Sequence, residues 1–162
     1  MRMVIMLLLA ALMAEPATAR QTSEAPRCAA GHAVLTVTGQ RTSRFCVEIA
    51  RTNAEQAQGL MFRKSLAANA GMIFPMNPPR FASFWMKNTL IPLDIIFIRA
   101  DGRIARIAAR TTPLSLAPVT SGEPVAAVFE IAGGRAAQLA IAVGDRVTWG
   151  PPSRIARGRR AS

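Results

Sequence analysis

Apolar and polar residues alternate along several short stretches of the chain, and this two-residue period predicts β-strands. In the stretch 44–49, three apolar side chains share one face and leave Cys46 on the other. The clearest predicted hairpin joins 93–100 to 103–109 through the turn Asp101-Gly102. Strands are predicted at 33–38, 44–50, 71–74, 81–86, 93–100, 103–109, 125–131 and 145–149, and connecting loops at the proline-containing stretches 75–79 and 111–124.

Helical signals are few. Thr52 and Glu55 form a capping-box pattern that opens a short helix running to about Leu60. Gly133-Gly134 is expected to open a second short helix that runs through Ala140. Many short strands with turn signals and only two helical segments predict a mostly β fold, a small antiparallel β-sandwich or barrel with one or two short helices.

The 162 residues are enough for one domain. The segment 1–19 has a cation at Arg2, an apolar run and the small-residue triplet 17–19, which is the layout of a cleaved signal peptide. An uncleaved anchor is the alternative, but the run is shorter than the roughly 20 residues that a membrane-spanning helix needs. We expect a periplasmic or secreted protein with a signal peptide at 1–19 cut near Ala19, a flexible leader at 20–32, one β-domain at 33–149 and a basic disordered tail at 150–162.

Two cysteines, Cys28 and Cys46, follow the predicted signal peptide. Export would place them in an oxidising compartment, where a disulfide would tie the leader to the strand at 44–50. Such a bond stabilises a fold by about 3 kcal/mol in the chain-entropy model. Two free thiols or a redox pair are the alternatives, and the absence of a C-x-x-C spacing disfavours the redox pair.

The chain is strongly basic, with a formal net charge of +11. Inside a cell this charge would favour nucleic acid. An exported chain meets anionic lipid head groups and acidic glycans instead, so we expect no nucleic-acid partner, and the tail at 150–162 would contact an anionic envelope surface. Alternatively, arginine is simply favoured in the coding of this genome. A monomer is expected.

The residues offer little for catalysis. His32 is the single histidine and lies in the leader, so a Ser-His-Asp triad or a histidine-built zinc site lacks its central residue. Four methionines follow the predicted signal peptide: Met61, Met72, Met76 and Met86. They raise copper(I) binding as an alternative, but they fall in separate predicted elements, and methionine commonly fills irregular cores. We predict no metal and no cofactor.

Two carboxylates, Asp94 and Glu130, lie within otherwise apolar strands, where an unpaired charge is costly. Lys87 is the expected partner and Arg63 the second, which makes a structural ion-pair network one interpretation. Paired carboxylates are also what glycoside hydrolysis uses. An enzyme that acts on an envelope glycan through Asp94 and Glu130 is therefore an alternative.

Six short motifs occur in order along the chain: GLMFR at 59–63, GMIF at 71–74, FWMKNT at 84–89, IPLD at 91–94, FE at 129–130 and GD at 144–145. Together they resemble the domain-of-unknown-function 192 family over about residues 33–149. The resemblance implies a compact β-sandwich or barrel with minor helix, often exported or lipid-anchored in bacteria. It implies no established reaction.

The FWMKNT motif precedes Pro92, which interrupts the strand pattern, so the chain must turn before the next strand. Asn88 and Thr89 can satisfy backbone groups in such a turn, which is a complete structural interpretation. A tryptophan face beside lysine and asparagine at the rim of a β-domain also suits a sugar or a carboxylate. Both interpretations stay open, and the candidate ligand-binding residues are Arg63, Trp85, Lys87, Asn88, Thr89, Asp94 and Glu130.

The leading hypothesis is an exported single-domain protein of unestablished activity that binds a small anionic or carbohydrate ligand at the cell envelope, a function that does not require catalysis. The glycan-acting enzyme is one alternative. A non-catalytic structural or interaction protein with a basic surface is the other.

Overall fold

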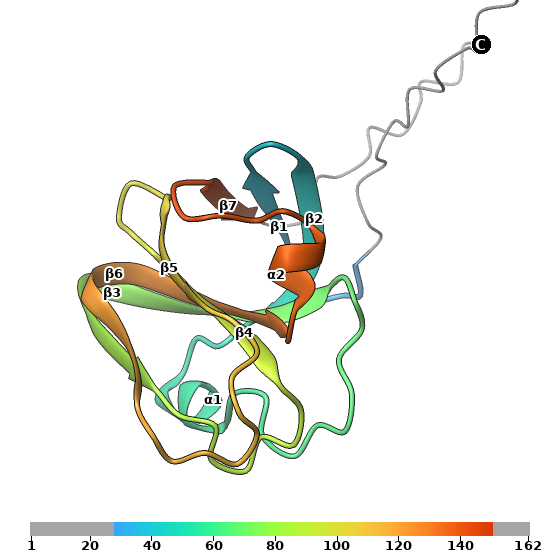
Figure 1. Ribbon diagram of the computed structural model, residues 1–162, viewed down its shortest axis with the longest axis vertical. Coiled ribbons are helices and arrows are strands. Elements are labelled where there is room, and N and C mark those ends of the chain that lie inside the picture. Colours follow the sequence, from blue (N-terminus) through green and yellow to red (C-terminus); the bar gives the residue numbers. More distant parts are fainter. Residues whose placement is uncertain (1–27, 151–162) are drawn as a thin grey trace, which may run out of the picture.

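Seven strands form one curled sheet in the order β5-β4-β6-β3-β2-β1-β7 in the computed structural model, which describes residues 28–150 (Figure 1). The predicted mostly β fold with one or two short helices is confirmed. Antiparallel pairing dominates, and the β2–β3 pair is parallel. The elements are β1 (Ala33–Thr38), β2 (Thr42–Ile49), α1 (Asn53–Gln58), β3 (Ala70–Phe84), β4 (Leu93–Ile98), β5 (Ile104–Ala108), β6 (Val119–Ala132), α2 (Arg135–Gln138) and β7 (Arg146–Gly150).

The sheet curls far enough for its two outer strands to touch. An isolated bridge joins Arg103, just before β5, to Arg146 at the start of β7. Next to it, the amide of Ile104 donates to the carbonyl of Asp145 at 2.9 Å, and the amide of Val147 donates to Gly102 at 2.7 Å. The result is a half-barrel whose two edge strands, β5 and β7, lie close together at one end, while α1 lies at the other end (Figure 1).

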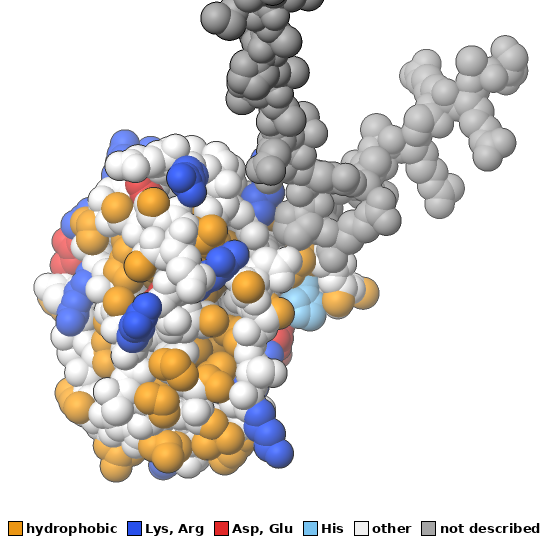
Figure 2. Space-filling model, turned by 45° about the vertical axis from the view of Figure 1, so that its right-hand side comes forward, with side chains coloured by type: hydrophobic (Ala, Val, Ile, Leu, Met, Phe, Trp, Pro, Cys, Tyr) orange, Lys and Arg blue, Asp and Glu red, His pale blue; other side chains and the backbone are white. Residues whose placement is uncertain are grey.

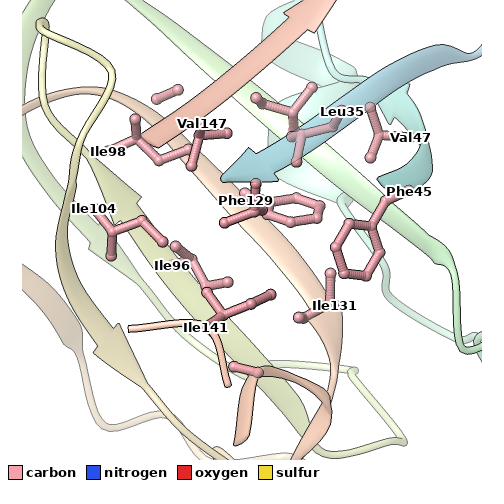
Figure 3. Close-up of a cluster of buried hydrophobic side chains, with 14 of the residues drawn as sticks. Leu35, Phe45, Val47, Ile96, Ile98, Ile104, Phe129, Ile131, Ile141 and Val147 are labelled. Carbon is pink, nitrogen blue, oxygen red and sulfur yellow. The ribbon is translucent and has the colours of Figure 1, made fainter. Parts of the chain in front are cut away.

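One hydrophobic cluster fills the inside of the curl (Figure 3). Phe45 from β2 meets Phe129 from β6 edge to face, with ring centroids 5.2 Å apart. Such pairs add specific geometry to the apolar area that they bury. Strands from both ends of the sheet contribute, since β1, β2, β4, β6 and β7 all place side chains in this cluster: Leu35, Val47, Ile96, Ile98, Ile131 and Val147.

A second cluster packs on the other face of the central strands. All six residues of β4 are buried, because alternate side chains enter the two clusters. Ile96 and Ile98 belong to the inner cluster, whereas Ile95 and Phe97 belong to the second one, together with Leu60 from the segment after α1. Strand β4 and the parts of β3 and β6 beside it are therefore covered on both faces, and the polar side chains of Asp94 and Glu130 are buried there.

The long strands β3 and β6 differ from the prediction. The sequence indicated two strands separated by prolines, but β3 runs unbroken from Ala70 to Phe84. Its pairing with β6 shifts register between Pro75 and Arg80, so the two following prolines fall where the ladder is interrupted. The predicted loop 111–124 was also too long, because β6 already begins at Val119.

Two local predictions are confirmed. The side chain of Thr52 accepts from the amide of Glu55 at 3.1 Å, and the Glu55 carboxylate accepts from the amide of Thr52 at 2.8 Å, which completes the capping box of α1. Cys28 and Cys46 form a disulfide with their Cα atoms 5.3 Å apart. A disulfide is consistent with an oxidising extracellular compartment.

The predicted signal peptide, most of the leader and the predicted basic tail beyond residue 150 lie outside the described residues. Within 28–150, no helix is long and apolar enough to span a bilayer.

Candidate functional site

A pocket of about 420 Å³ opens between α1 with its following turn and the second half of β3. This volume lies within the range of small-molecule sites. The lining combines aromatic, aliphatic and a few polar side chains, and Glu130 from β6 is the one carboxylate among them. The residues that line the pocket include Gln56, Leu60, Met61, Phe74, Met76, Arg80, Phe81, Phe84, Trp85, Thr89 and Glu130.

Glu130 sits at the centre of the sheet, opposite Met72 of β3 and Ile95 of β4. Only 5% of the residue is exposed. Among the described residues, no side chain or backbone group donates a hydrogen bond to its carboxyl, and no cation pairs with it. Burial raises the pKa of Glu130 to about 8. At neutral pH the carboxyl is therefore mostly protonated, and it can both donate and accept a hydrogen bond.

The backbone around Glu130 is fixed by the close approach of β3. A Cβ atom at Gly71 would lie 2.5 Å from the carbonyl oxygen of Glu130 and 2.7 Å from the Phe129 ring. Only glycine allows this contact, so the GMIF motif holds β6 in place beneath the pocket.

The mouth of the pocket carries Trp85, which is 51% exposed. The Lys87 ammonium lies 5.1 Å from the centroid of the Trp85 ring, a cation–π contact. The sequence pattern predicted that Lys87 pairs with Asp94 or Glu130. In the structure its ammonium instead contacts Trp85. The two side chains together form an exposed, cationic aromatic surface beside the pocket.

Asn88 and Thr89 form the turn that follows. Asn88 adopts a positive φ of 54°, and its carbonyl accepts from the amide of Phe62 at 2.8 Å. The buried Thr89 side chain donates to the carbonyl of Lys87 at 3.2 Å and also lines the pocket. Asn88 also donates from Nδ2 to the sulfur of Met61 at 3.8 Å. The turn thus attaches the wall at Met61 and Phe62 to the mouth at Trp85.

Asp94 does not reach this pocket. Its strand partner is Ile131, whereas Glu130 pairs with Ile95, so the two carboxylates point to opposite faces of the sheet. Asp94 accepts from the amides of Arg110 at 2.8 Å, Gly134 at 2.7 Å and Ala136 at 2.8 Å. It is a structural anchor for α2, and the two carboxylates share no cleft in which to act as a glycosidase pair.

Arg63 also lies elsewhere. Its guanidinium donates to both carboxylate oxygens of Glu48 on β2, at 2.6 and 2.8 Å. This bidentate hydrogen bonding holds the pKa of Glu48 below its usual value. The expected role of Arg63 as a partner of Asp94 or Glu130 was therefore wrong.

Several pocket residues were not anticipated from the sequence, namely Gln56, Arg80, Phe81 and Phe84. Gln56 donates to the carbonyls of Ala50 at 3.3 Å and Pro75 at 3.2 Å, and so holds α1 against β3. The capping box at Thr52 had placed this helix, but no local pattern shows which strand it covers.

The methionines considered for copper gather around the same region. Met72, Met76 and Met86 belong to the second hydrophobic cluster, and Met61 and Met76 line the pocket. Their sulfurs are partly engaged, since Thr111 donates to Met86 at 3.1 Å. Within 28–150, no group of three or more His, Cys, Asp or Glu residues could hold a metal ion.

Comparisons with known proteins agree with this fold. A crystal structure of a protein of unknown function from Novosphingobium aromaticivorans is 52% identical, with a TM-score of 0.70, and the match covers 72% of this chain and 84% of that one. A structure described as a putative transcription regulator from Sinorhizobium meliloti is 39% identical, with a TM-score of 0.70, covering 73% of this chain and 92% of that one. A comparison with curated proteins finds no match.

The profile of the family DUF192, described as "Uncharacterized ACR", matches residues 33–149. This range contains the GMIF and FWMKNT motifs, the pocket with Glu130 and every strand except the last residue of β7. The chain belongs to the DUF192 family.

Proposed function

We propose that this protein is a binding protein of the cell envelope that takes a small carbohydrate or anionic ligand into the pocket above Glu130. One observation carries the proposal: a buried carboxyl without a partner lines a pocket with an exposed tryptophan at its mouth. A buried carboxyl in apolar surroundings lowers stability unless it is paired, so a use outside folding accounts for it.

The chemistry of the lining fits a hydroxylated ring. A protonated Glu130 can donate to one ligand oxygen and accept from another hydroxyl. The faces of Trp85, Phe81 and Phe84 offer apolar area for the ring itself. Arg80 in the lining and Lys87 over Trp85 add positive charge for an acidic substituent.

Binding alone is the function that these contacts support. The second carboxylate that a glycosidase would need is engaged in three backbone hydrogen bonds on the opposite face of the sheet. An exported binding protein therefore fits the geometry better than a glycan-acting enzyme that uses Asp94 and Glu130.

The test uses Trp85 as a reporter. The chain contains 2 tryptophans and no tyrosine, so Trp149→Phe leaves Trp85 as the single strong fluorophore, at the mouth of the pocket. Titration of this variant with neutral oligosaccharides, acidic oligosaccharides and small carboxylic acids should give a saturable fluorescence change for one class. Absence of a saturable change with every class would contradict the proposal.

Glu130→Leu separates binding from folding in the same background. It replaces the carboxyl by an apolar group of similar size, so we expect the melting temperature to stay the same or rise while ligand binding is lost. Glu123→Gln is the matched control, since Glu123 is a half-exposed carboxylate that pairs with Arg99 and does not line the pocket. Equal ligand affinity in Glu130→Leu and the control would show that the carboxyl is not part of the site.

A further inference from the structure

Exposed apolar side chains gather at one end of the molecule, around the mouth of the pocket. Seven large apolar residues of the described chain are exposed, and six of them lie on segments that adjoin one another. The amide of Phe62 donates to Asn88, and the amide of Leu114 donates to Thr89 at 3.1 Å. We name these six the apolar rim: Phe62, Phe81, Trp85, Leu90, Leu114 and Leu116.

The rim continues beyond the first pocket. A second, smaller hollow of about 290 Å³ lies between Trp85 and Leu116, next to Pro118. The amide of Met86 donates to the carbonyl of Ser115 at 2.9 Å, which joins the loop before β4 to the loop before β6 at this place. The apolar rim is therefore one surface, built from three loops and the outer part of β3.

Two members of the rim have an unfavourable backbone conformation. Phe62 has a φ of 63° and Leu114 a φ of 62°, the left-handed region that bulky side chains rarely adopt. Both side chains are more than half exposed, so burial in the core does not explain their positions. Backbone strain of this kind concentrates at functional surfaces.

The rim has positive charge and few acidic neighbours in sequence. The chain contains no Asp or Glu between Glu55 and Asp94, nor between Asp101 and Glu123, and all of the rim falls within these two stretches. Lys64, Arg80 and Lys87 accompany it, and all three are exposed. Figure 2 shows apolar side chains gathered over the lower end of the molecule, with Lys or Arg side chains and no acidic side chain visible there.

We propose that the apolar rim docks onto the surface of an anionic lipid bilayer, with Trp85, Leu114 and Leu116 entering the interface. A tryptophan in contact with a lysine suits the headgroup level, where one end of the ring is apolar and the other is wet. Apolar side chains on segments that carry cations and no acidic residues combine the two attractions that hold a protein on an anionic membrane.

A lipid surface fits this pattern better than a folded partner. Five of the six side chains project from loops and Phe81 from the outer part of β3, and two hollows open beside Phe81, Trp85 and Leu116, whereas a stable protein interface has a closely packed apolar centre. The proposal goes beyond the binding of a ligand in the pocket and does not depend on it. It differs from contact through the tail at 150–162, because it assigns the contact to the folded domain.

Quenching of Trp85 by lipid tests the proposal in the full chain. The Trp149→Phe protein is mixed with vesicles of phosphatidylglycerol and phosphatidylethanolamine whose acyl chains carry bromine. We expect strong quenching of Trp85 with these vesicles and little with phosphatidylcholine vesicles. The readout is local, so attachment of the chain through its ends alone would not produce it.

The matched variants are Leu114→Asn together with Leu116→Ser on the rim, and Val143→Ser as control. Asn tolerates the left-handed conformation at position 114, and Val143 is 59% exposed but lies outside the rim. We expect the rim variant to lower vesicle affinity by about tenfold, as removal of two apolar anchors should, and the control to leave it unchanged. Circular dichroism melts confirm that both variants are folded.

Three outcomes would overturn the proposal. Vesicle binding without quenching of Trp85 would place the contact on another segment. Equal affinities of the rim variant and the Val143→Ser control would show that the rim is not involved. Sedimentation that reveals a dimer, abolished by the rim variant in the absence of lipid, would show that a second copy covers the rim instead.

Discussion

Glu130 is the residue whose environment departs most from what folding alone requires. It is buried among apolar side chains, and no charged group of the described chain contacts it. Its pKa of about 8 results from desolvation, because no opposite charge compensates the loss of water. A carboxyl of this kind makes the stability of the protein depend on pH in a direction opposite to that of a salt-bridged one.

Glu130→Gln is predicted to remove a loss of stability that the wild-type protein shows at rising pH. In the unfolded chain the carboxyl titrates near 4.5, whereas in the folded protein it titrates near 8. Between these values the folded state holds one more proton, so the free energy of unfolding falls by roughly 1.4 kcal/mol per pH unit in this window. Urea unfolding of both proteins at several pH values should show the difference growing from about pH 5 to about pH 8.

Glu123→Gln serves as the control for this prediction, since Glu123 is half-exposed and paired with Arg99. Its unfolding free energies should follow those of the wild type with pH. Parallel pH curves for the wild type and Glu130→Gln would contradict the raised pKa of Glu130.

The sequence identified some residues of the site, but it did not show which residues contact them or complete the pocket. Trp85, Thr89 and Glu130 were candidates and line the pocket, while Lys87 lies beside it. The assignment of Lys87 to a carboxylate failed because a long side chain has many partners within reach, and only the fold shows that Trp85 is the nearest surface. Arg80 and Phe81 follow two prolines, and no local pattern shows that they face α1.

At the scale of elements, strands with clear alternation and a turn signal were predicted well. The hairpin of β4 and β5 has Gly102 at a φ of 82° in the turn. The breaks were less well predicted, since prolines ended β3 in the sequence analysis but fall at a bulge in the structure. The parallel pairing of β2 with β3 also leaves no local signal, because it depends on the path of the intervening α1.

Asp94→Ala is predicted to destabilise the attachment of α2 to the sheet. Three buried or half-buried backbone amides would lose their acceptor, so we expect the free energy of unfolding to fall by about 3 kcal/mol or more. Denaturant unfolding measures the loss, and hydrogen exchange at the amides of Gly134 and Ala136 locates it. Ligand binding at Trp85 should persist wherever the variant is folded.

Asp101→Ala is the control for that variant, because Asp101 is exposed and accepts one backbone hydrogen bond, from Arg103. A loss of stability in Asp94→Ala no larger than in this control would contradict the anchoring role.

At the scale of the whole molecule, one end of the half-barrel is formed by β2, β1 and β7. β1 joins β2 to β7, and Cys46 on β2 is tied to Cys28 ahead of β1. The disulfide therefore restrains the segment that leads into β1, the strand between β2 and β7. The sequence predicted the mostly β fold class but not the order of the strands in the sheet, because the strand order depends on contacts between distant segments.

Replacement of both cysteines by serine is predicted to lower the free energy of unfolding by about 3 kcal/mol, mainly through the greater freedom of the unfolded chain. The two cysteines are 18 positions apart in sequence. Urea unfolding of the oxidised protein, the reduced protein and the double variant measures the effect. Identical midpoints for oxidised and reduced protein would contradict it.

The pairing of β1 with β7 has a consequence for how the chain reaches this fold. Strand β1 is the first strand of the described chain and β7 the last, yet five residue pairs connect them, from Val34 with Gly150 to Thr38 with Arg146. A ribosome releases β1 long before its second neighbour exists, so the sheet cannot close during synthesis. Contacts between such distant parts of a chain also slow the search for the native state. The domain should therefore complete its folding only after the whole of β7 has been released.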